Sequence, residues 1–353
     1  MIRDITLPEG FKVAVVGDLH VKGSYGYAAS FPDRRESERQ AIYEEIRRNC
    51  EGTELVVLLG DVFDGRSNPS GSIREFTAFL ESLGDRHVVI MGGNHDTFSD
   101  GSGALDYIRE IRGKKWHVVT GDPETLTAGG KTLHFVPYMR CTHTGHKDVA
   151  ELTEWIMTSI PTGCDMVFTH HAVSSSRMNH GSTDLLKGEP VLPRERLKAS
   201  CVRSFHGHIH RPSNDESTFV VGSVMNEEVG EDGRKSMAVA SPSTGLVVSF
   251  ELPGRSLWKV EAKTLEEGME AAAGKDFARI SLSERPSDSE ISALPKNIEI
   301  VVAPKERKET DAKPSEDLSR DSLTPEKLLS KYAKNKNVSE ERIQRGWALV
   351  SAE

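Results

Sequence analysis

The chain has 353 residues, of which 37% are hydrophobic and 28% charged, and its formal net charge is −9. This length allows a full-sized core plus one or two smaller modules, and the composition is ordinary for a soluble globular protein. No apolar run approaches the roughly 20 residues of a membrane span, and the N-terminus lacks the layout of a signal peptide, so we expect a cytoplasmic protein without a membrane-spanning segment.

Residues 1–254 alternate apolar runs of β-type with amphipathic helical stretches. Continuous apolar runs are typical of buried strands, so the alternation predicts an α/β domain in which helices enclose two sheets. A Gly-Gly pair predicts a hairpin over residues 125–138. The other expected strands lie at 12–17, 55–60, 87–93, 165–169, 202–207, 218–223, 236–241 and 245–252, and the expected helices at 36–50, 71–84, 103–113 and 146–160.

The pattern changes after residue 254. Residues 255–304 contain short strand-like runs around a helix-like segment, which we interpret as a small α+β accessory domain. Residues 305–322 are polar and charged without apolar periodicity, and we predict a linker. Residues 323–353 hold two expected short helices, 325–335 and 340–352. These helices are either a docked tail or an element that folds on a partner protein.

Five polar motifs each follow an apolar β-run. In an α/β sheet this places them on the loops at the carboxyl ends of the strands, where such folds build their sites. Asp18 and His20 are two residues apart, as are His208 and His210, so an extended backbone directs each pair to one side. The motifs are 17-GDLH-20, 60-GDVFD-64, 92-GGNHD-96, 169-THHA-172 and 206-HGHIH-210.

The side chains in these motifs provide the oxygen and nitrogen donors that suit manganese, iron or zinc. No cysteine takes part, which disfavours a structural zinc site. Any one motif alone is weak evidence, because a lone D-x-H is more often a chance match and a buried histidine pair is usually two satisfied imidazoles. Five motifs in this order, each after a strand, predict a two-metal site. The residues alone leave open whether His170 or His171 is the ligand.

The series D-x-H, G-D-x-x-D, G-N-H-D, H and G-H-x-H over residues 17–210 resembles the signature of the calcineurin-like metallophosphoesterases. The resemblance implies a four-layer α/β/β/α sandwich with two divalent metal ions, which generate a hydroxide for in-line attack on phosphorus. It implies that His95 contacts the scissile phosphate or protonates the leaving oxygen, and that Asp96 orients His95. The implied ligands are Asp18, His20 and His210 for one ion, Asn94, His170 (with His171 as the fallback) and His208 for the other, and Asp61 as the bridge.

Flanking segments resemble the SbcD-type DNA repair and recombination nucleases, which are bacterial or phage-encoded. That resemblance implies a manganese-dependent 3′–5′ exonuclease and single-strand endonuclease, with iron or zinc as alternative metals. Residues 255–304 would cap DNA, residues 323–353 would bind a coiled-coil ATPase of the SbcC type, and the chain would form a homodimer in the bacterial or host cytoplasm. The segments are GDVFDGRSNPS at 60–70, LHFVPY at 133–138 and HGHIHRP at 206–212, with the runs at 218–241 that follow.

Two other functions compete with a DNA nuclease. One is a stand-alone phosphodiesterase or phosphatase for small substrates. The net charge of −9 argues mildly against DNA, although two bound cations would carry a positive field of their own. The other is a non-catalytic scaffold of the same fold, which the intact ligand set and the presence of His95 disfavour.

Overall fold

A computed structural model describes residues 5–23, 32–97, 103–111, 114–178, 181–182, 188–231 and 233–302. The chain divides into two compact units, residues 1–303 and 304–353. The second unit, which includes the predicted linker at 305–322 and the terminal helices, lies outside the described residues. Within the described ranges, no helix combines the length and the apolar character required to cross a bilayer.

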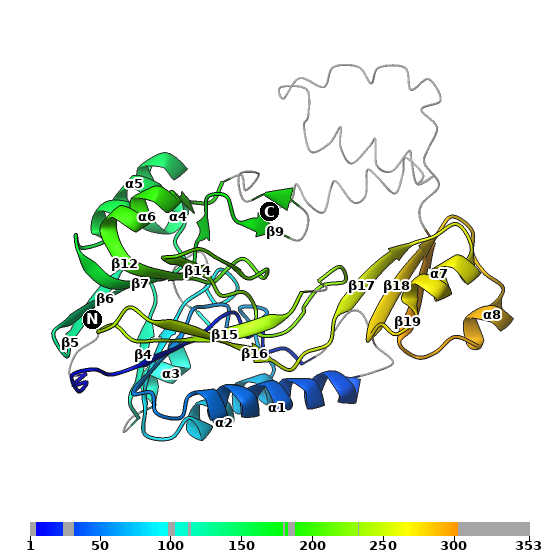
Figure 1. Cartoon of the computed structure of the whole chain (residues 1–353), viewed down its shortest axis with the longest axis horizontal. Helices are drawn as coiled ribbons and strands as arrows, with labels where there is room; N and C mark the ends of the chain where they lie inside the picture. Colours follow the sequence, from blue (N-terminus) through cyan, green and yellow to red (C-terminus); the bar gives the residue numbers. More distant parts are fainter. Residues whose placement is uncertain are drawn as a thin grey trace, which may run out of the picture. The chain divides into compact units, whose positions relative to one another are not determined.

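The first sheet has six strands in the order β16-β15-β1-β2-β3-β4. Figure 1 shows β15 and β16 of this sheet side by side. The strands β1 to β4 are parallel, and β15 and β16 extend the sheet in antiparallel fashion. The sequence VAVV of β1 is buried throughout, as a strand that is covered on both faces requires. The bounds are β1 Val13–Val16, β2 Leu55–Leu58, β3 His87–Met91, β4 Trp116–Val119, β15 Lys235–Ala240 and β16 Val247–Leu252.

The second sheet also has six strands, in the order β13-β14-β12-β7-β6-β5. Its four inner strands are parallel, and β5 and β13 run antiparallel at its two edges. The predicted hairpin is confirmed as β5 and β6, where Gly129 and Gly130 have φ of 54° and 71°. A two-residue hairpin turn with positive φ at both positions favours glycine. The bounds are β5 Glu124–Ala128, β6 Lys131–Val136, β7 Cys164–Thr169, β12 Cys201–His206, β13 Ser213–Asn214 and β14 Thr218–Val220.

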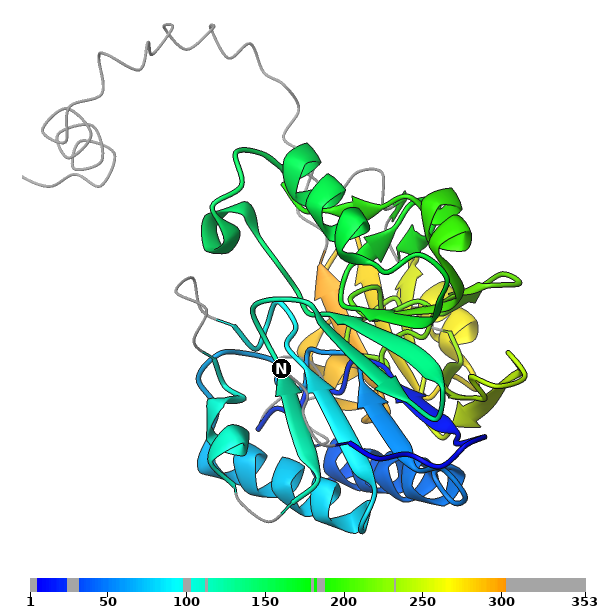
Figure 2. The same ribbon diagram turned by 90° about the vertical axis from the view of Figure 1, so that its left-hand side faces the viewer.

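Helices cover the outer face of each sheet, which confirms the predicted four-layer α/β/β/α sandwich. Figure 2 shows the blue and cyan helices on one outer face and the green helices on the other. Three buried apolar clusters fill the space between successive layers, and the middle one joins the two sheets. The helices are α1 Pro32–Asn49, α2 Ser70–Ser82 and α3 Asp106–Glu110 beside the first sheet, and α4 Cys141–Thr144, α5 Val149–Ser159 and α6 Arg194–Ser200 beside the second.

Several short elements differ from those that the sequence pattern predicts. The helix expected at 103–113 is only α3, because residues 103–104 bind back to the loop after β3, where the Ala104 N–H donates to the Asp96 carbonyl at 2.8 Å. The pattern does not predict β4 or α6, since each is short and buries a single side chain deeply. The pattern also does not predict two short strand pairs, which are β8 Ala172–Val173 with β11 Val191–Leu192 and β9 Arg177–Met178 with β10 Gly181–Ser182.

The accessory region alternates strands and helices, as β17 Leu257–Glu261, α7 Leu265–Ala272, β18 Phe277–Leu282, α8 Asp288–Ser292 and β19 Ile298–Val302. Its three strands are all parallel. Parallel neighbours need a crossover connection, and α7 and α8 lie in the two crossovers. The predicted α+β class of this small region is therefore wrong, because it is an α/β unit. Its own apolar cluster packs Ile280 of β18 against α7.

Candidate metal centre

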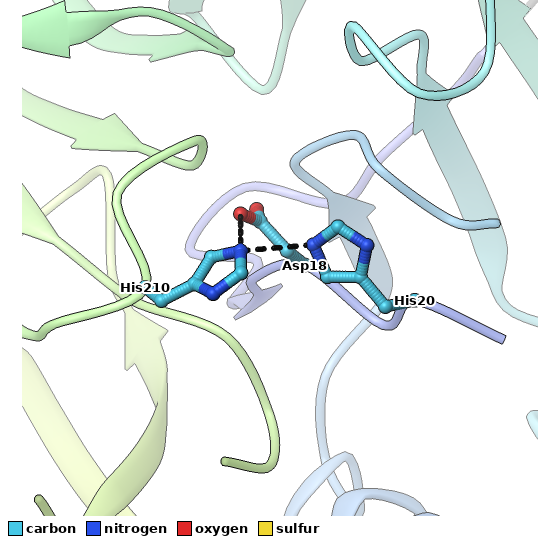
Figure 3. Close-up of side chains that lie close together, drawn as sticks. All are labelled: Asp18, His20 and His210. Carbon is cyan, nitrogen blue, oxygen red and sulfur yellow. Dashed lines mark hydrogen bonds and ion pairs between the residues drawn. The ribbon is translucent and has the colours of Figure 1, made fainter. Parts of the chain in front are cut away.

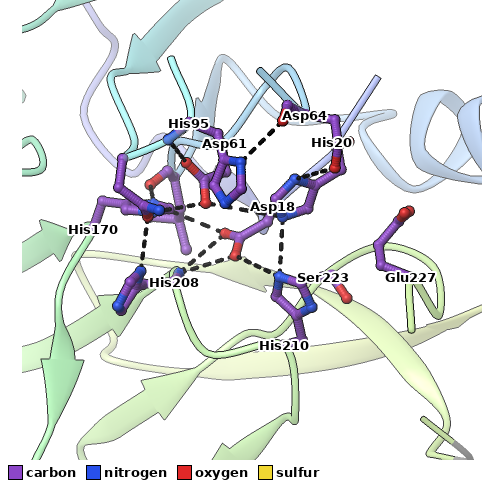
Figure 4. Close-up of polar contacts among 12 residues, drawn as sticks. Asp18, His20, Asp61, Asp64, His95, His170, His208, His210, Ser223 and Glu227 are labelled. Atoms are coloured by element: carbon purple, nitrogen blue, oxygen red, sulfur yellow. Dashed lines mark hydrogen bonds and ion pairs between the residues drawn. The ribbon is translucent and has the colours of Figure 1, made fainter. Parts of the chain in front are cut away.

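The five motifs lie where the strands end, as the sequence predicts. Asp18, Asp61 and Asn94 follow β1, β2 and β3 of the first sheet. From the second sheet, His170 follows β7, and the H-x-H pair at 208 and 210 follows β12. Figure 4 shows the side chains of Asp18, Asp61, His170, His208 and His210 directed toward one another. The sandwich thus brings together ligands that are separated by almost 200 residues in the sequence.

Asp18, His20 and His210 form one cluster, which we call site one (Figure 3). The Nε2 atoms of His20 and His210 are 2.9 Å apart, and His210 Nε2 lies 3.9 Å from Asp18 Oδ2. The Asp18 carboxylate also accepts the main-chain N–H of His208 at 3.0 Å, which ties the β12 loop to the β1 loop. All three residues were predicted as ligands of one ion, and the fold brings them together.

An acidic side chain lies beside the outer nitrogen of each site-one histidine. His210 Nδ1 lies 2.9 Å from Glu231 Oε1, and His20 Nδ1 lies 3.5 Å from Asp64 Oδ1. Glu231 is almost completely buried and also accepts from Lys235 Nζ at 2.9 Å. The sequence motifs do not identify Glu231 as a partner of His210, because no fixed spacing relates the two. The sequence indicates Glu231 only through its position in the acidic segment that follows the H-x-H motif.

The second cluster, site two, consists of Asn94, His170 and His208. Asn94 Oδ1 lies 2.9 Å from His208 Nδ1 and 3.2 Å from His170 Nε2. The outer nitrogen of His170, Nδ1, bonds to the Leu59 carbonyl at 2.8 Å. The outer nitrogen of His208, Nε2, lies 3.0 Å from Glu189, a residue that the sequence analysis does not identify.

Asp61 lies between the two sites, as predicted for the bridging ligand. Its Oδ2 is 3.2 Å from His170 Nε2 and 3.8 Å from His20 Nε2. Its Oδ1 accepts the main-chain N–H of His95 at 2.8 Å. Gly93 makes this close approach possible, since a Cβ at that position would lie 2.1 Å from Asp61 Oδ1.

The geometry separates the neighbouring histidines 170 and 171. His170 belongs to a group of potential ligand atoms with Asp61 and His208, and His171 belongs to none of the groups found among the described residues. The His171 ring stacks on Tyr138 and its Nε2 lies 3.2 Å from the Pro137 carbonyl. Burial, and then the charges of the neighbouring histidines, lower the pKa of His171 to about 3. The geometry therefore favours His170 as the ligand and leaves His171 a neutral core residue.

Residues 11–212, more than half of the chain, match the family profile described as calcineurin-like phosphoesterase. The chain belongs to the calcineurin-like phosphoesterases. No curated protein sequence matches it. Among solved structures, one described as a novel archaeal phosphodiesterase aligns with 69% of this chain and all of its own, at 13% identity and a TM-score of 0.32. A TM-score of that size is too low to support an inference about fold or substrate.

The inward-facing atoms of this phosphoesterase fit divalent cations. At His170 the Leu59 carbonyl can only accept, so Nδ1 carries the proton and Nε2 presents a lone pair to Asp61 and Asn94. At His20 and His210 the acids beside Nδ1 favour the same tautomer, so that the two Nε2 lone pairs face each other. Acceptors that converge in this way need a proton or a cation between them. As a member of the family, the chain is a metal-dependent phosphoester hydrolase.

The electrostatics of the metal-free phosphoesterase lead to the same conclusion. Burial lowers the pKa of a histidine, but at His20 the nearby carboxylates of Asp64 and Asp61 outweigh burial and raise the pKa to about 9. At His170, burial is outweighed mainly by Asp61, and the pKa also rises to about 9. Without metal, the site stabilises positive charge on its ligands.

His95 stands beside the ligands with its ring 5.0 Å from that of His20. Its Nδ1 lies 3.0 Å from the Asp64 carbonyl, and this contact orients the ring. The prediction that Asp96 orients His95 is wrong. The buried Asp96 carboxylate instead accepts the main-chain N–H groups of Val62, Phe63 and Gly93 at 3.0–3.1 Å, and so ties the loop after β2 to the loop after β3.

Three of the predicted ligands have a left-handed backbone. The φ angles are 45° at His20, 45° at Asp61 and 75° at His208. Non-glycine residues rarely adopt this conformation, which costs of order 1–3 kcal/mol for each residue. The sharp turns direct these side chains into the centre immediately after the strands end.

Proposed function

We propose that this chain is a manganese-dependent DNA nuclease, the nuclease subunit of an SbcD-type repair or recombination complex. The observation that carries the hydrolytic chemistry is that Asp61 lies 3.8 Å from His20 of site one and 3.2 Å from His170 of site two. His95 lies beside His20 and Asp61, with its ring held by a main-chain carbonyl. Support for DNA as the substrate comes from the resemblance of the segments around the centre. These are GDVFDGRSNPS at 60–70, which leads into α2, LHFVPY at the end of β6, and HGHIHRP at 206–212, which leads toward β14.

In this proposal sites one and two would each hold one ion, and Asp61 would be available to both. When bound, the ions would polarise the phosphate and lower the pKa of a water molecule. The carbonyl of Leu59 and the carboxylates of Glu189 and Glu231 keep the ligand nitrogens facing inward. Because Nδ1 of His95 donates to a carbonyl, Nε2 carries a proton only in the imidazolium form, which is the form that can protonate the leaving oxygen.

The finer parts of the proposal concern activity, metal and partners. We infer 3′–5′ exonuclease and single-strand endonuclease activity in the cytoplasm, with manganese as the metal and iron or zinc as alternatives. Residues 255–304 would contact DNA, residues 323–353 would bind an SbcC-type coiled-coil ATPase, and the nuclease would act as a homodimer. These proposals rest on the order of the segments along the chain and on its resemblance to SbcD-type nucleases.

The decisive test compares substrates for one preparation. The full-length chain with Mn²⁺ is assayed on linear duplex DNA, on single-stranded circles and on bis-p-nitrophenyl phosphate, with and without a coiled-coil ATPase of this type. We expect cleavage of both DNA substrates in the presence of Mn²⁺ and no cleavage with EDTA. Rapid cleavage of the small diester, with DNA left intact under every condition, would contradict the nuclease proposal and leave the hydrolase intact.

A stand-alone phosphoesterase for small substrates is the second candidate. The net charge of −9 favours it, as does the exposed carboxylate of Asp64 beside His20. Truncation near residue 305 distinguishes the two candidates. The nuclease should lose binding of the ATPase and processive cleavage, whereas the small-substrate enzyme should keep its full turnover.

A further inference from the structure

The segment Asn226–Glu231, here called the strap, contacts site one directly. Glu231 Oε1 holds Nδ1 of His210 at 2.9 Å. Glu231 Oε2 accepts from Lys235 Nζ at 2.9 Å and from the main-chain N–H of Glu227 at 3.0 Å. Lys235 in turn donates to the His210 carbonyl at 2.9 Å. With its side chain 1% exposed and both oxygens engaged, Glu231 has little freedom to move independently of its own main chain.

The main chain of the strap binds the accessory domain. The Gly230 N–H donates to the Leu257 carbonyl at 2.6 Å, and the Leu257 N–H donates to the Glu231 carbonyl at 2.8 Å. Leu257 is the first residue of β17, and its buried side chain packs against Phe277 of β18 and Val229 of the strap. One residue, Glu231, thus contacts a metal ligand with its side chain and the accessory domain with its main chain.

A second set of contacts fixes the chain just before β17. Asn226 Nδ2 donates to the Arg255 carbonyl at 2.9 Å, and the Arg255 guanidinium binds Glu38 of α1 at 2.8 Å. The accessory domain therefore contacts the strap through Arg255 and through Leu257, which are two positions apart in the sequence. A shift of β17 relative to the strap would have to break the pair of hydrogen bonds at Leu257 or move Glu231 with it.

We propose that Glu231 is a positioning residue through which docking of the accessory domain controls metal affinity at site one. The docked β17 holds the Glu231 main chain, the Glu231 carboxylate fixes the His210 ring, and the ring presents Nε2 to the ion. The proposal rests on the metal centre and not on DNA as the substrate. Because coupling between two binding events is reciprocal, metal at site one must also strengthen the docking. A ligand that moves the accessory domain would then change metal affinity at a site it does not touch.

The test measures Mn²⁺ binding by titrating the full-length chain and following the free-ion signal by electron paramagnetic resonance. Glu231→Gln should weaken one of the two ions by about 10–100-fold and leave the other unchanged. Leu257→Ala should weaken the same ion by about fivefold or more. Leu282→Ala is the matched control, because Leu282 is an equally buried leucine of the accessory core that lies away from the strap. It creates a similar cavity and should leave both affinities unchanged.

The double variant Glu231→Gln/Leu257→Ala tests whether Glu231 transmits the coupling between the accessory domain and site one. If the coupling runs through Glu231, Leu257→Ala should have no further effect in the Glu231→Gln background. Additive losses would overturn the proposal, and so would equal weakening by Leu257→Ala and Leu282→Ala, which would indicate a general loss of stability. If the alanine variants do not fold, Leu257→Val and Leu282→Val give the same comparison.

Hydrogen exchange of the unmodified protein provides a second readout that needs no variant. The amides of Gly230 and Leu257 should exchange more slowly with Mn²⁺ than with EDTA, because metal at site one should stabilise the docked state. The amide of Leu282 serves as the reference. Equal exchange of the Gly230 and Leu257 amides in the two conditions would contradict the coupling, whatever the substrate of the enzyme.

Discussion

Sites one and two are neighbouring candidate cation sites with different surroundings. Site one has a ligand carboxylate in Asp18 and further acids behind its histidines in Asp64 and Glu231. Site two has the neutral amide of Asn94 as a ligand, and its buried histidine is held by a carbonyl instead of an acid. Negative charge near a cation strengthens binding most where water is excluded. We therefore expect stepwise loading, in which site one binds the tighter ion and site two the weaker one.

The largest effect should come from removing the group that the two sites share. Asp61→Asn keeps the size of the side chain and tolerates the positive φ of this position, but it removes the shared charge. Because the metals contribute several kcal/mol to transition-state stabilisation, turnover should fall by about 10³-fold or more. Metal analysis after gel filtration should show fewer than two ions per chain. Two retained ions with normal turnover would show that Asp61 does not bridge.

A smaller loss is expected at His95, which belongs to neither site. His95→Ala should lower turnover by about 10²–10⁴-fold, the usual contribution of a general acid, with both Mn²⁺ affinities unchanged. His95 lies close enough to His20 and Asp61 to be a ligand in principle. Loss of an ion in the variant, detected by the same titration, would mean that His95 is a further ligand of site one and not the acid.

Glu189→Gln tests the difference between the two sites directly. It weakens the hold on the outer nitrogen of His208 and should reduce the affinity of the weaker ion by about 10–100-fold, without changing the tighter one. Glu195→Gln, on the exposed surface of α6, is the matched control and should change neither affinity. Weakening of the tighter ion by Glu189→Gln would reverse the order of loading proposed above.

The two sites should also share a pH dependence of their metal affinity. The pKa values of His20 and His170 are raised to about 9 in the metal-free protein, so both must release a proton before they bind metal. Apparent Mn²⁺ affinity should rise with pH up to about 9, by at most about tenfold per unit for each proton displaced.

The stability of the metal-free protein should change in the opposite direction. A folded-state pKa above the unfolded value of about 6.5 gives stability that is fully present below pH 6.5 and is lost as pH rises through 9. Melting temperatures with EDTA should therefore fall between pH 6.5 and 9, and the increase caused by Mn²⁺ should grow. A constant increase across this range would show that ligation displaces no protons.

The sequence predicts which side chains meet at the centre, because each one follows a strand, and strand order alone brings the carboxyl ends together. The acidic residues that contact those side chains cannot be predicted in the same way. Glu189 and Glu231 reach His208 and His210 only through the path of irregular segments, and no spacing rule relates them. Asp96 shows the converse error, because its place beside His95 in the sequence does not determine where its carboxylate points.

The choice between His170 and His171 could not be made from local pattern either. Both follow a buried strand and both side chains are buried. Only the packing of the two sheets decides that one ring enters the metal centre and the other stacks on Tyr138. The sequence pattern does not predict short elements such as β4 and α6 for a related reason. They contain too few apolar residues to show a helical or strand periodicity.

The left-handed backbone at His20, Asp61 and His208 should influence which residues replace them in homologues that have lost metal binding. In a descendant that no longer needs metal, the strain at these three positions would persist while its benefit would be gone. Glycine relieves that strain fully and asparagine in part, whereas a β-branched residue would increase it. Inactive descendants should therefore carry glycine or asparagine at these positions more often than alanine or valine. That substitution pattern would identify a lost phosphoesterase from its sequence long after its ligands had disappeared.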